Sequence, residues 1–305
     1  SSETSTVSVV PSNGKVVVMP PVWAIGSLVL AKTLAGTTRA IAMMARIDGR
    51  RVVRQLRTIN VYLPDDGAGG SRRHVVGGLA AWIAQGRLRV VEARAEAERT
   101  IEAARLLQGA GVDAVNISDS AMARVRMGAL AVAFGVQHDL DLECVVHVTT
   151  RDRNLMALES ELLGAHALGV RDILALTGDP PRIGDYPSGT GVWDVDSIGL
   201  IEILSRLNRG EDAAGSPIGQ RAGFTIACAL DPTAADAATE WDRLERKLAA
   251  GAHLVMTQPL YSLEQVEAMF AEAIRRFGPD GVPVPILLGV LPLQSARHAE
   301  FLHNE

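Results

Sequence analysis

The residues of this 305-residue chain that could do chemistry follow short apolar runs, at the point where each run ends. They carry hydroxyl, carboxylate, imidazole and amide groups, which can hydrogen-bond a cofactor or move a proton. In chain order they are Ser118 and Asp119, His147 and Thr149, Thr177 and Asp179, Asp231, and Thr257 and Gln258. Polar groups at the ends of several strands are typical of a site built at one face of a parallel barrel.

The longest of these segments, LTGDPPRIGDYPSGTGVWDVDS (176–197), is rich in Gly, Pro and Asp. Long loops of this kind at the end of a buried strand are usually functional. Pro180 and Pro181 restrict the chain just after Asp179, and Gly178 lets a flat ligand approach the backbone closely. The segment therefore predicts a carboxylate held in place at residue 179, although the same aspartate could simply cap a turn.

The elements that must position these residues alternate between apolar, β-branched runs and stretches with helical spacing. Six runs are predicted as strands, over 113–118, 142–148, 170–176, 222–228, 252–257 and 284–290. Helices are predicted over 98–110, 154–168, 197–208, 234–250 and 263–277. The strand starts lie 29, 28, 52, 30 and 32 residues apart, which indicates βα units around a buried parallel sheet.

Two architectures fit this order, an open doubly wound sheet and a (β/α)8 barrel. No G-x-G-x-x-G sequence opens a helix after the first strand, which argues against a dinucleotide-binding open sheet. We therefore predict an α/β fold of the (β/α)8 TIM type. The barrel is expected to be incomplete, because LRVVE (88–92) is an uncertain first strand and the eighth strand would follow residue 305.

Composition limits the class of protein. Hydrophobic residues make up 48% of the chain and charged residues 21%, which excludes a disordered tail, a collagen-like fibre and a disulfide scaffold. The two cysteines, Cys144 and Cys228, cannot form a thiolate-rich zinc site, and no metal is expected. The apolar run 22–31 is about half the length of a membrane span, so we expect a soluble, cytoplasmic protein.

Charge divides the chain at about residue 91. Residues 1–91 carry ten Arg, two Lys and four acidic residues, a net charge of +8, and the rest carries −13. The arginines are scattered and have little aromatic interleaving, so nucleic-acid binding is not expected. We predict an atypical basic N-terminal extension over 1–91 and a barrel domain over 92–305.

Several motifs resemble the methylenetetrahydrofolate reductase family. They are ALTGDPP (175–181), GDYP, VDSIGLIEIL, AAGAHLVMTQPLY (249–261) and ILLGVLP (286–292). The resemblance covers about residues 98–305 and is greatest to the reductase part of bacterial bifunctional enzymes that also carry a homocysteine S-methyltransferase domain. It implies a barrel that binds FAD and uses NAD(P)H to reduce 5,10-methylenetetrahydrofolate to 5-methyltetrahydrofolate, in one-carbon metabolism and methionine biosynthesis. The partners implied are the folate and the nicotinamide cofactor, and a homo-oligomer is left open.

The resemblance also implies roles for individual residues. Asp179 matches the acidic residue near the flavin ring, where a fixed carboxylate favours the cationic iminium form of the folate. Gln258 matches the glutamine that binds the pterin. The remaining matches are to residues that bind FAD: Ser118, His147, Thr177, Gly178, Ser197, Asp231, Arg246 and Lys247. Arg243 stands where the family has a neutral residue, one turn before Arg246 on the same side of the helix, and is predicted to join this basic group toward FAD.

Some of these residues have a purely structural interpretation as well. His147 could be a core histidine bonded to backbone. Arg243, Arg246 and Lys247 could form a solvated charged face with nearby glutamates. Lysine occurs only three times in the chain, which favours a role in phosphate binding for Lys247. Ser197 is predicted to cap the helix that it begins.

The chain departs from the family pattern before residue 98. The family's first strand ends in a glutamate followed shortly by Pro-Pro, and that glutamate is implied to transfer the proton. Glu92 is the nearest counterpart, but the prolines are absent. The alternative prediction is therefore a truncated, catalytically inert barrel that binds FAD weakly or not at all.

Overall fold

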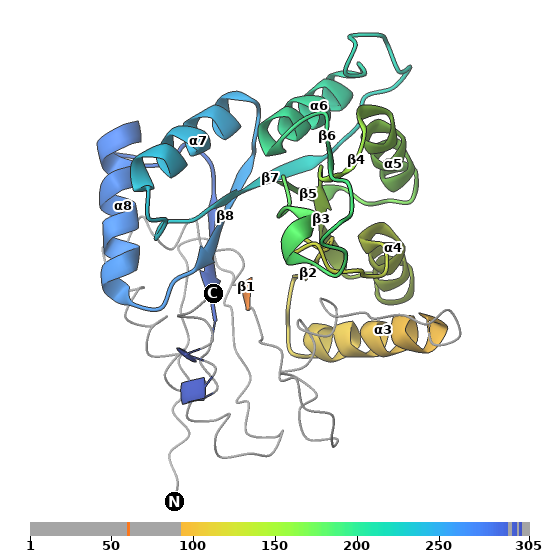
Figure 1. Cartoon of the computed structure of the whole chain (residues 1–305), viewed down its shortest axis with the longest axis horizontal. Coiled ribbons are helices and arrows are strands. Elements are labelled where there is room, and N and C mark those ends of the chain that lie inside the picture. Colours follow the sequence, from red (N-terminus) through yellow and green to blue (C-terminus); the bar gives the residue numbers. More distant parts are fainter. Residues whose placement is uncertain (1–59, 62–92, 292–294, 298, 301–305) are drawn as a thin grey trace, which may run out of the picture.

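Strands and helices alternate along the protein, whose structure is a computed structural model that describes residues 60–61, 93–291, 295–297 and 299–300 (Figure 1). The strands of the main sheet are β1 (Asn60–Val61), β2 (Ala114–Ile117), β3 (Glu143–Thr149), β5 (Asp172–Leu176), β7 (Thr225–Leu230), β8 (Leu254–Pro259) and β9 (Ile286–Val290). The helices are α3 (Ala93–Gly109), α4 (Ala129–Leu140), α5 (Leu155–Ala167), α6 (Ser197–Arg209), α7 (Ala237–Ala249) and α8 (Leu263–Phe277).

The sheet is parallel throughout and has the order β1-β9-β8-β7-β5-β3-β2. Its helices lie around the outside of the curved sheet (Figure 1). Within the described part of the chain no pairing joins β1 to β2, so the sheet is an incomplete TIM-type barrel. The predicted α/β class and the predicted incomplete barrel are confirmed.

The strands β3, β5, β7, β8 and β9 contribute to two cores because successive side chains point to opposite faces. On the outer face, Val146, Ile173 and Ile226 are fully buried against helix residues such as Leu204 and Leu244. On the inner face a smaller cluster is formed by Leu174, Ala227, Met256 and Leu287. The carboxyl ends of these buried strands are therefore fixed from both sides, and they carry the polar residues.

A second sheet of two strands lies beyond the end of β3. It pairs β4 (Asp152–Arg153) with β6 (Val192–Trp193), again in parallel. The amide of Val192 donates to the carbonyl oxygen of Arg151 at 2.6 Å and continues this pairing. The far end of the long segment 176–197 is thus attached to the chain that follows β3.

All six predicted strands and all five predicted helices are present, with ends shifted by a few residues. Helix α4 and the β4–β6 pair were not predicted. The proposed strand 88–92 and nearly all of the predicted extension 1–91 lie outside the described residues. The exception is β1, which pairs with β9 through Asn60 and Gly289.

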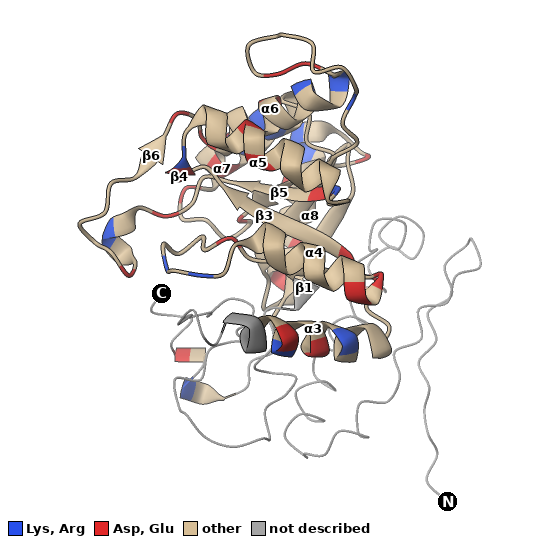
Figure 2. Cartoon of the chain, turned by 90° about the vertical axis from the view of Figure 1, so that its right-hand side faces the viewer, with Lys and Arg blue, Asp and Glu red and all other residues tan. Residues whose placement is uncertain are grey.

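Charges of both signs occur on α3, α6, α7 and α8, whereas α4 and α5 carry acidic residues but no Lys or Arg. Figure 2 shows acidic and basic residues interspersed along α3, where Arg105 pairs with Glu102 at 3.3 Å. None of the described helices combines the length and the apolar character needed to span a membrane.

Candidate active site at the carboxyl ends of the strands

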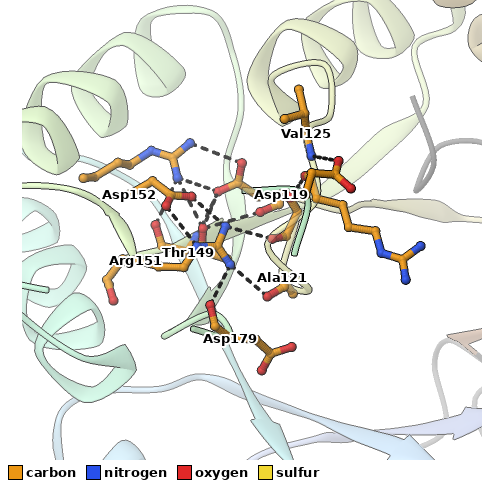
Figure 3. Close-up of polar contacts among 12 residues, drawn as sticks. Asp119, Ala121, Val125, Thr149, Arg151, Asp152 and Asp179 are labelled. Atoms are coloured by element: carbon orange, nitrogen blue, oxygen red, sulfur yellow. Dashed lines mark hydrogen bonds and ion pairs between the residues drawn. The ribbon is translucent and has the colours of Figure 1, made fainter. Parts of the chain in front are cut away.

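The ends of β2, β3 and β5 lie side by side, since Ile117 is in register with Val146 and Thr149 with Leu176. The chain after β2 is joined to the end of β3 by polar contacts between Asp119 and Thr149 (Figure 3) and by an ion pair between Asp119 and Arg153. The buried carboxylate of Asp119 accepts from the amide of Thr149 at 2.9 Å and from Arg153 Nη1 at 2.7 Å. These bonds hold the chain after β2 onto the end of β3.

A second arginine, Arg151, lies in the turn after β3 and bonds to the turns after β2 and β5. Its side chain is 3% exposed and pairs with Asp152 at 2.6 Å. Its Nη1 donates to the carbonyl oxygens of Ala121 at 3.0 Å and Asp179 at 3.1 Å. Its Nη2 donates to the carbonyl oxygen of Ser120 at 3.0 Å. The guanidinium therefore links the turn after β2 to the turn after β5 (Figure 3).

Gly178 makes this arrangement possible. Its φ is +85°, in the region that L-residues with a side chain rarely adopt. A Cβ atom there would lie 3.2 Å from both Arg151 Nη1 and Thr149 Cβ. The glycine thus supplies both the turn and the close approach of Arg151.

Asp179 combines a fixed backbone with an unengaged carboxylate. Its amide donates to the carbonyl oxygen of Ala121 at 2.8 Å, and its own carbonyl accepts from Arg151. The carboxylate is exposed and points away from the arginine in Figure 3, and none of the described residues donates to it. The interpretation of Asp179 as a turn cap is therefore not supported by its contacts.

Thr177 and Ser197 meet across the long segment. The amide of Ser197 donates to Thr177 Oγ1 at 3.0 Å. The prediction that Ser197 caps its helix was wrong: the N-cap of α6 is Asp196, whose Oδ1 accepts from the amides of Ile198 and Gly199. A carboxylate one residue earlier reaches the first free amides, and Ser197 is the first residue of the helix.

His147 lies on the inner face of the barrel, in register with Leu174. It is 7% exposed, and its Nε2 has no hydrogen-bond partner among the described residues. Burial lowers the pKa of His147 to about 4, against the opposing effect of Asp119. The imidazole is therefore neutral at pH 7 and offers an unused nitrogen inside the barrel. Ser118 is partly buried at the end of β2.

The basic residues of α7 separate into buried and exposed groups. Lys247 is buried and donates from Nζ to the carbonyl oxygen of Ala229 at 2.7 Å, and it lies 3.8 Å from Glu240. Arg243 lies 3.9 Å from Glu240 with its side chain 43% exposed, and Arg246 is exposed. Burial lowers the pKa of Lys247, and the charge of Glu240 acts in the opposite direction.

Glu240 also joins α7 to the end of β7, because the amide of Asp231 donates to its Oε1 at 3.2 Å. Asp231 in turn accepts from the amide and hydroxyl of Thr233. Asp231, Glu240 and Lys247 therefore form one polar group at this strand end. Within this group Lys247 and Glu240 carry opposite charges 3.8 Å apart, while the arginines of α7 keep exposed charge.

Gln258 lies exposed at the end of β8, where the pairing with β9 shifts register between Met256 and Pro259. The neighbouring Thr257 is buried, and its Oγ1 accepts from the amide of Gly289 at 2.8 Å. A Cβ atom on Gly289 would lie 2.6 Å from the carbonyl oxygen of Thr257. The close contact between the two strands thus sets where Gln258 leaves the sheet.

The structure brings Thr177, Gly178, Asp179 and Ser197 together at one corner and places Lys247 and Asp231 together at another. Glu92 lies outside the described residues. In the described ranges no three His, Cys, Asp or Glu side chains are grouped so that they could hold a metal ion. Sequence reasoning did not identify Arg151. The sequence does contain one indication that Arg151 is unusual, the alternating charges of RDR (151–153) directly after a buried strand. Alternating charges, however, usually indicate an exposed turn.

Comparison with known families supports the reductase resemblance. The family model described as methylenetetrahydrofolate reductase matches residues 93–304. Methylenetetrahydrofolate reductase 1 of Schizosaccharomyces pombe is 24% identical over 160 residues, which cover 52% of this chain and 24% of the yeast protein. Methylenetetrahydrofolate reductase 2 of Saccharomyces cerevisiae is 27% identical over 173 residues, which cover 55% of this chain and 26% of that protein. The match thus spans about a quarter of each relative.

Solved structures show weaker overall similarity. A 2,3-dimethylmalate lyase of the PEP mutase/isocitrate lyase superfamily aligns with a TM-score of 0.42 and 16% identity, covering 66% of this chain and 68% of the lyase. An oxaloacetate acetylhydrolase aligns with a TM-score of 0.43 and 10% identity, covering 87% of this chain and 84% of the hydrolase.

Proposed function

Because the chain belongs to the methylenetetrahydrofolate reductase family, we propose that it reduces 5,10-methylenetetrahydrofolate to 5-methyltetrahydrofolate, with FAD as cofactor and NAD(P)H as electron donor. The observation that carries the proposal is the corner at Gly178 and Asp179. There a backbone fixed on both sides presents a free carboxylate at the carboxyl ends of the strands. The family and its named relatives support the proposed reaction, and this corner supports its proposed location.

The residues present fit a flavin. His147 offers an unpartnered, buried Nε2 on the inner face of the barrel. Gly178 is partly exposed at the same corner and adopts its φ of +85° without the strain that a side chain would cause. Arg243 and Arg246 retain exposed charge that could pair with phosphates, and Lys247 has donors left after its bond to Ala229. The imidazole nitrogen is one of the buried side-chain atoms for which the described residues supply no hydrogen-bond partner.

When bound, FAD would pass a hydride from the nicotinamide cofactor to the folate. Asp179 would stabilise the cationic iminium form of the folate by its negative charge, close to the carbon that accepts the hydride. Gln258 would orient the pterin through its amide, which both donates and accepts. Glu92 remains the proposed proton-transfer residue.

The other predicted contacts divide between the two ends of the cofactor. Ser118, His147, Thr177 and Gly178 would lie along the ring. The contacts proposed toward the phosphates and adenosine are Asp231, Arg243, Arg246 and Lys247, and Ser197 is proposed to contact FAD between the two groups, beside Thr177. The bond from Ser197 to Thr177 would couple the two groups, since movement of either residue would disturb the other.

The test is the absorbance of the purified protein after incubation with FAD. We expect a bound flavin spectrum that is bleached by NADH or NADPH without oxygen and restored by methylenetetrahydrofolate. Protein that neither retains FAD nor binds it on reconstitution would contradict the proposal and support the inert barrel. Flavin that is bleached but never restored by the folate would contradict the substrate assignment alone.

A further inference from the structure

Arg151 is the most buried arginine among the pairs that the described part of the chain contains, and it lies directly behind the proposed site. Its side chain is 3% exposed, whereas its counter-ion Asp152 is 53% exposed. Burial of an arginine is costly unless its donors are used. Here they are used on Asp152 and on three backbone carbonyls, so the residue has a defined structural task.

The three carbonyls belong to two different turns. Ser120 and Ala121 follow β2, and Asp179 follows β5. A planar guanidinium can reach all three at once because its donors point outward in a fixed fork. A lysine ammonium at the same position carries the charge but cannot span that distance in the same geometry.

The contact with Asp179 fixes this residue on its carbonyl side. On its amide side, Asp179 donates to the carbonyl oxygen of Ala121, which itself accepts from Arg151. Both peptide groups of Asp179 are therefore anchored to the same arginine, one directly and one through Ala121. Pro180 restricts the backbone further. Only the side-chain torsions of Asp179 remain free.

We propose that Arg151 is the positioning residue of the site: through these two peptide groups it fixes the direction in which the Asp179 carboxylate leaves the backbone. This inference rests on the proposed function for the role of that carboxylate, but the anchoring itself does not. Arg151 touches neither the folate nor the cofactor in this assignment. It acts through Asp179.

The first experiment measures amide hydrogen exchange in residues 178–185 of the cofactor-free protein. Arg151→Lys is expected to speed exchange at the amide of Asp179 at least tenfold. The matched control is Arg276→Gln, since Arg276 is 11% exposed and bonds to Glu272, Asp242 and Glu245 on the helices. The control is expected to leave exchange in 178–185 within twofold. Equal exchange in wild type and Arg151→Lys would overturn the proposal.

A milder variant keeps the test decisive if Arg151→Lys does not fold. Asp152→Ala removes two bonds to the guanidinium from an exposed position. It is expected to speed exchange at Asp179 about threefold. Unchanged exchange in this variant, with Arg151→Lys insoluble, would also overturn the inference.

The second experiment separates positioning from stability by measuring reoxidation of the reduced flavin by the folate. Arg151→Lys is expected to slow this step at least tenfold while changing FAD affinity by less than threefold. In combination with Asp179→Asn it should add less than threefold, because both changes act through one carboxylate. Multiplicative losses would show that Arg151 acts elsewhere. If the wild-type protein neither binds nor reduces FAD, the proposed function is contradicted. The hydrogen-exchange experiment would then still test whether Arg151 anchors the backbone of Asp179.

Discussion

The Nζ atom of Lys247 lies 2.7 Å from the carbonyl oxygen of Ala229, so a cation is buried beside the end of β7. Glu240 at 3.8 Å is its nearest carboxylate. Lys247 thus bonds α7 to the sheet, and it is also proposed to bind a phosphate of the cofactor. A substitution can separate these two roles because only the second requires the cofactor.

Replacing Lys247 by Met should therefore affect both stability and cofactor binding. The Ala229 carbonyl would lose this donor, and Glu240 would keep only Arg243 and the amide of Asp231, which should cost about 1–3 kcal/mol of unfolding free energy. FAD should dissociate more readily, while the rate of the loaded enzyme changes less. Urea unfolding and flavin titration measure the two effects. Arg246→Ala is the control for stability, since Arg246 is exposed. Unchanged FAD affinity in Lys247→Met would contradict the proposed role of Lys247 in binding a phosphate of FAD.

Gly178→Ala should destabilise the protein by about 1–2 kcal/mol because a side chain is unfavourable at φ +85°. The new methyl group would also press on Thr149 and Arg151. Gly164→Ala in α5 is the matched control: no atom lies within 4 Å of its added Cβ, and it should stabilise by about 0.5–1 kcal/mol. Chemical denaturation compares the two. Equal effects in both variants would contradict the strain argument.

Asp179→Asn should leave FAD bound and slow the folate half-reaction roughly 10- to 100-fold, because the amide lacks the charge that stabilises the cationic folate. Reduction of the flavin by NAD(P)H provides an internal control in the same variant and should change little. Stopped-flow absorbance measures both half-reactions. An unchanged rate of folate reduction would refute the electrostatic role of Asp179.

The fold could be predicted from the sequence because its strands are buried on both faces. The run 286–290 (ILLGV), for example, is apolar throughout and every residue in it is buried, which leaves little ambiguity about its location. The helix start at Ser197 was placed correctly, but its cap was not. The sequence DVDS offers two good capping residues in succession, and only backbone geometry distinguishes Asp196 from Ser197.

The network behind the site could not be predicted in the same way. Arginine is rarely buried, so Arg151 gave no signal of its own. Its partners are backbone carbonyls of Ser120, Ala121 and Asp179, which no residue type encodes. Asp119 was recognised as a polar residue at a strand end, but its contacts with Arg153 and Thr149 depend on the register of β2 with β3.

Gly289→Ala should displace the end of β8. The added Cβ would lie 2.6 Å from the carbonyl oxygen of Thr257 and 2.9 Å from that of Gln258. We expect a loss of about 1–3 kcal/mol in stability from overpacking and a KM for the folate that rises more than kcat falls. Gly223→Ala is the control, because its Cβ would meet no atom within 4 Å. A KM equal to that of the wild type would show that Gln258 does not depend on this contact.

Stability should depend on pH through His147. Its pKa is lowered by burial from 6.5 to about 4, so the unfolded chain binds a proton that the folded protein does not. Its contribution is complete above pH 6.5 and is lost as the pH falls toward 4, by roughly 3 kcal/mol in all. Urea unfolding from pH 4 to 8 measures this slope. In His147→Gln the slope over that range should be smaller, and an identical slope would contradict the assignment.

The pairing of β4 with β6 has a consequence for how the long segment can vary. Residue 177 leaves the sheet beside Thr150, and residue 192 returns to the carbonyl of Arg151, so the excursion between them starts and finishes at neighbouring points. A closed excursion of this kind tolerates changes of length at its tip with little entropic penalty. Asp185 is bonded to Ala123 and Val125, so the exposed residues 186–190 beyond it are the part of the segment whose length can change while Asp179 keeps its place.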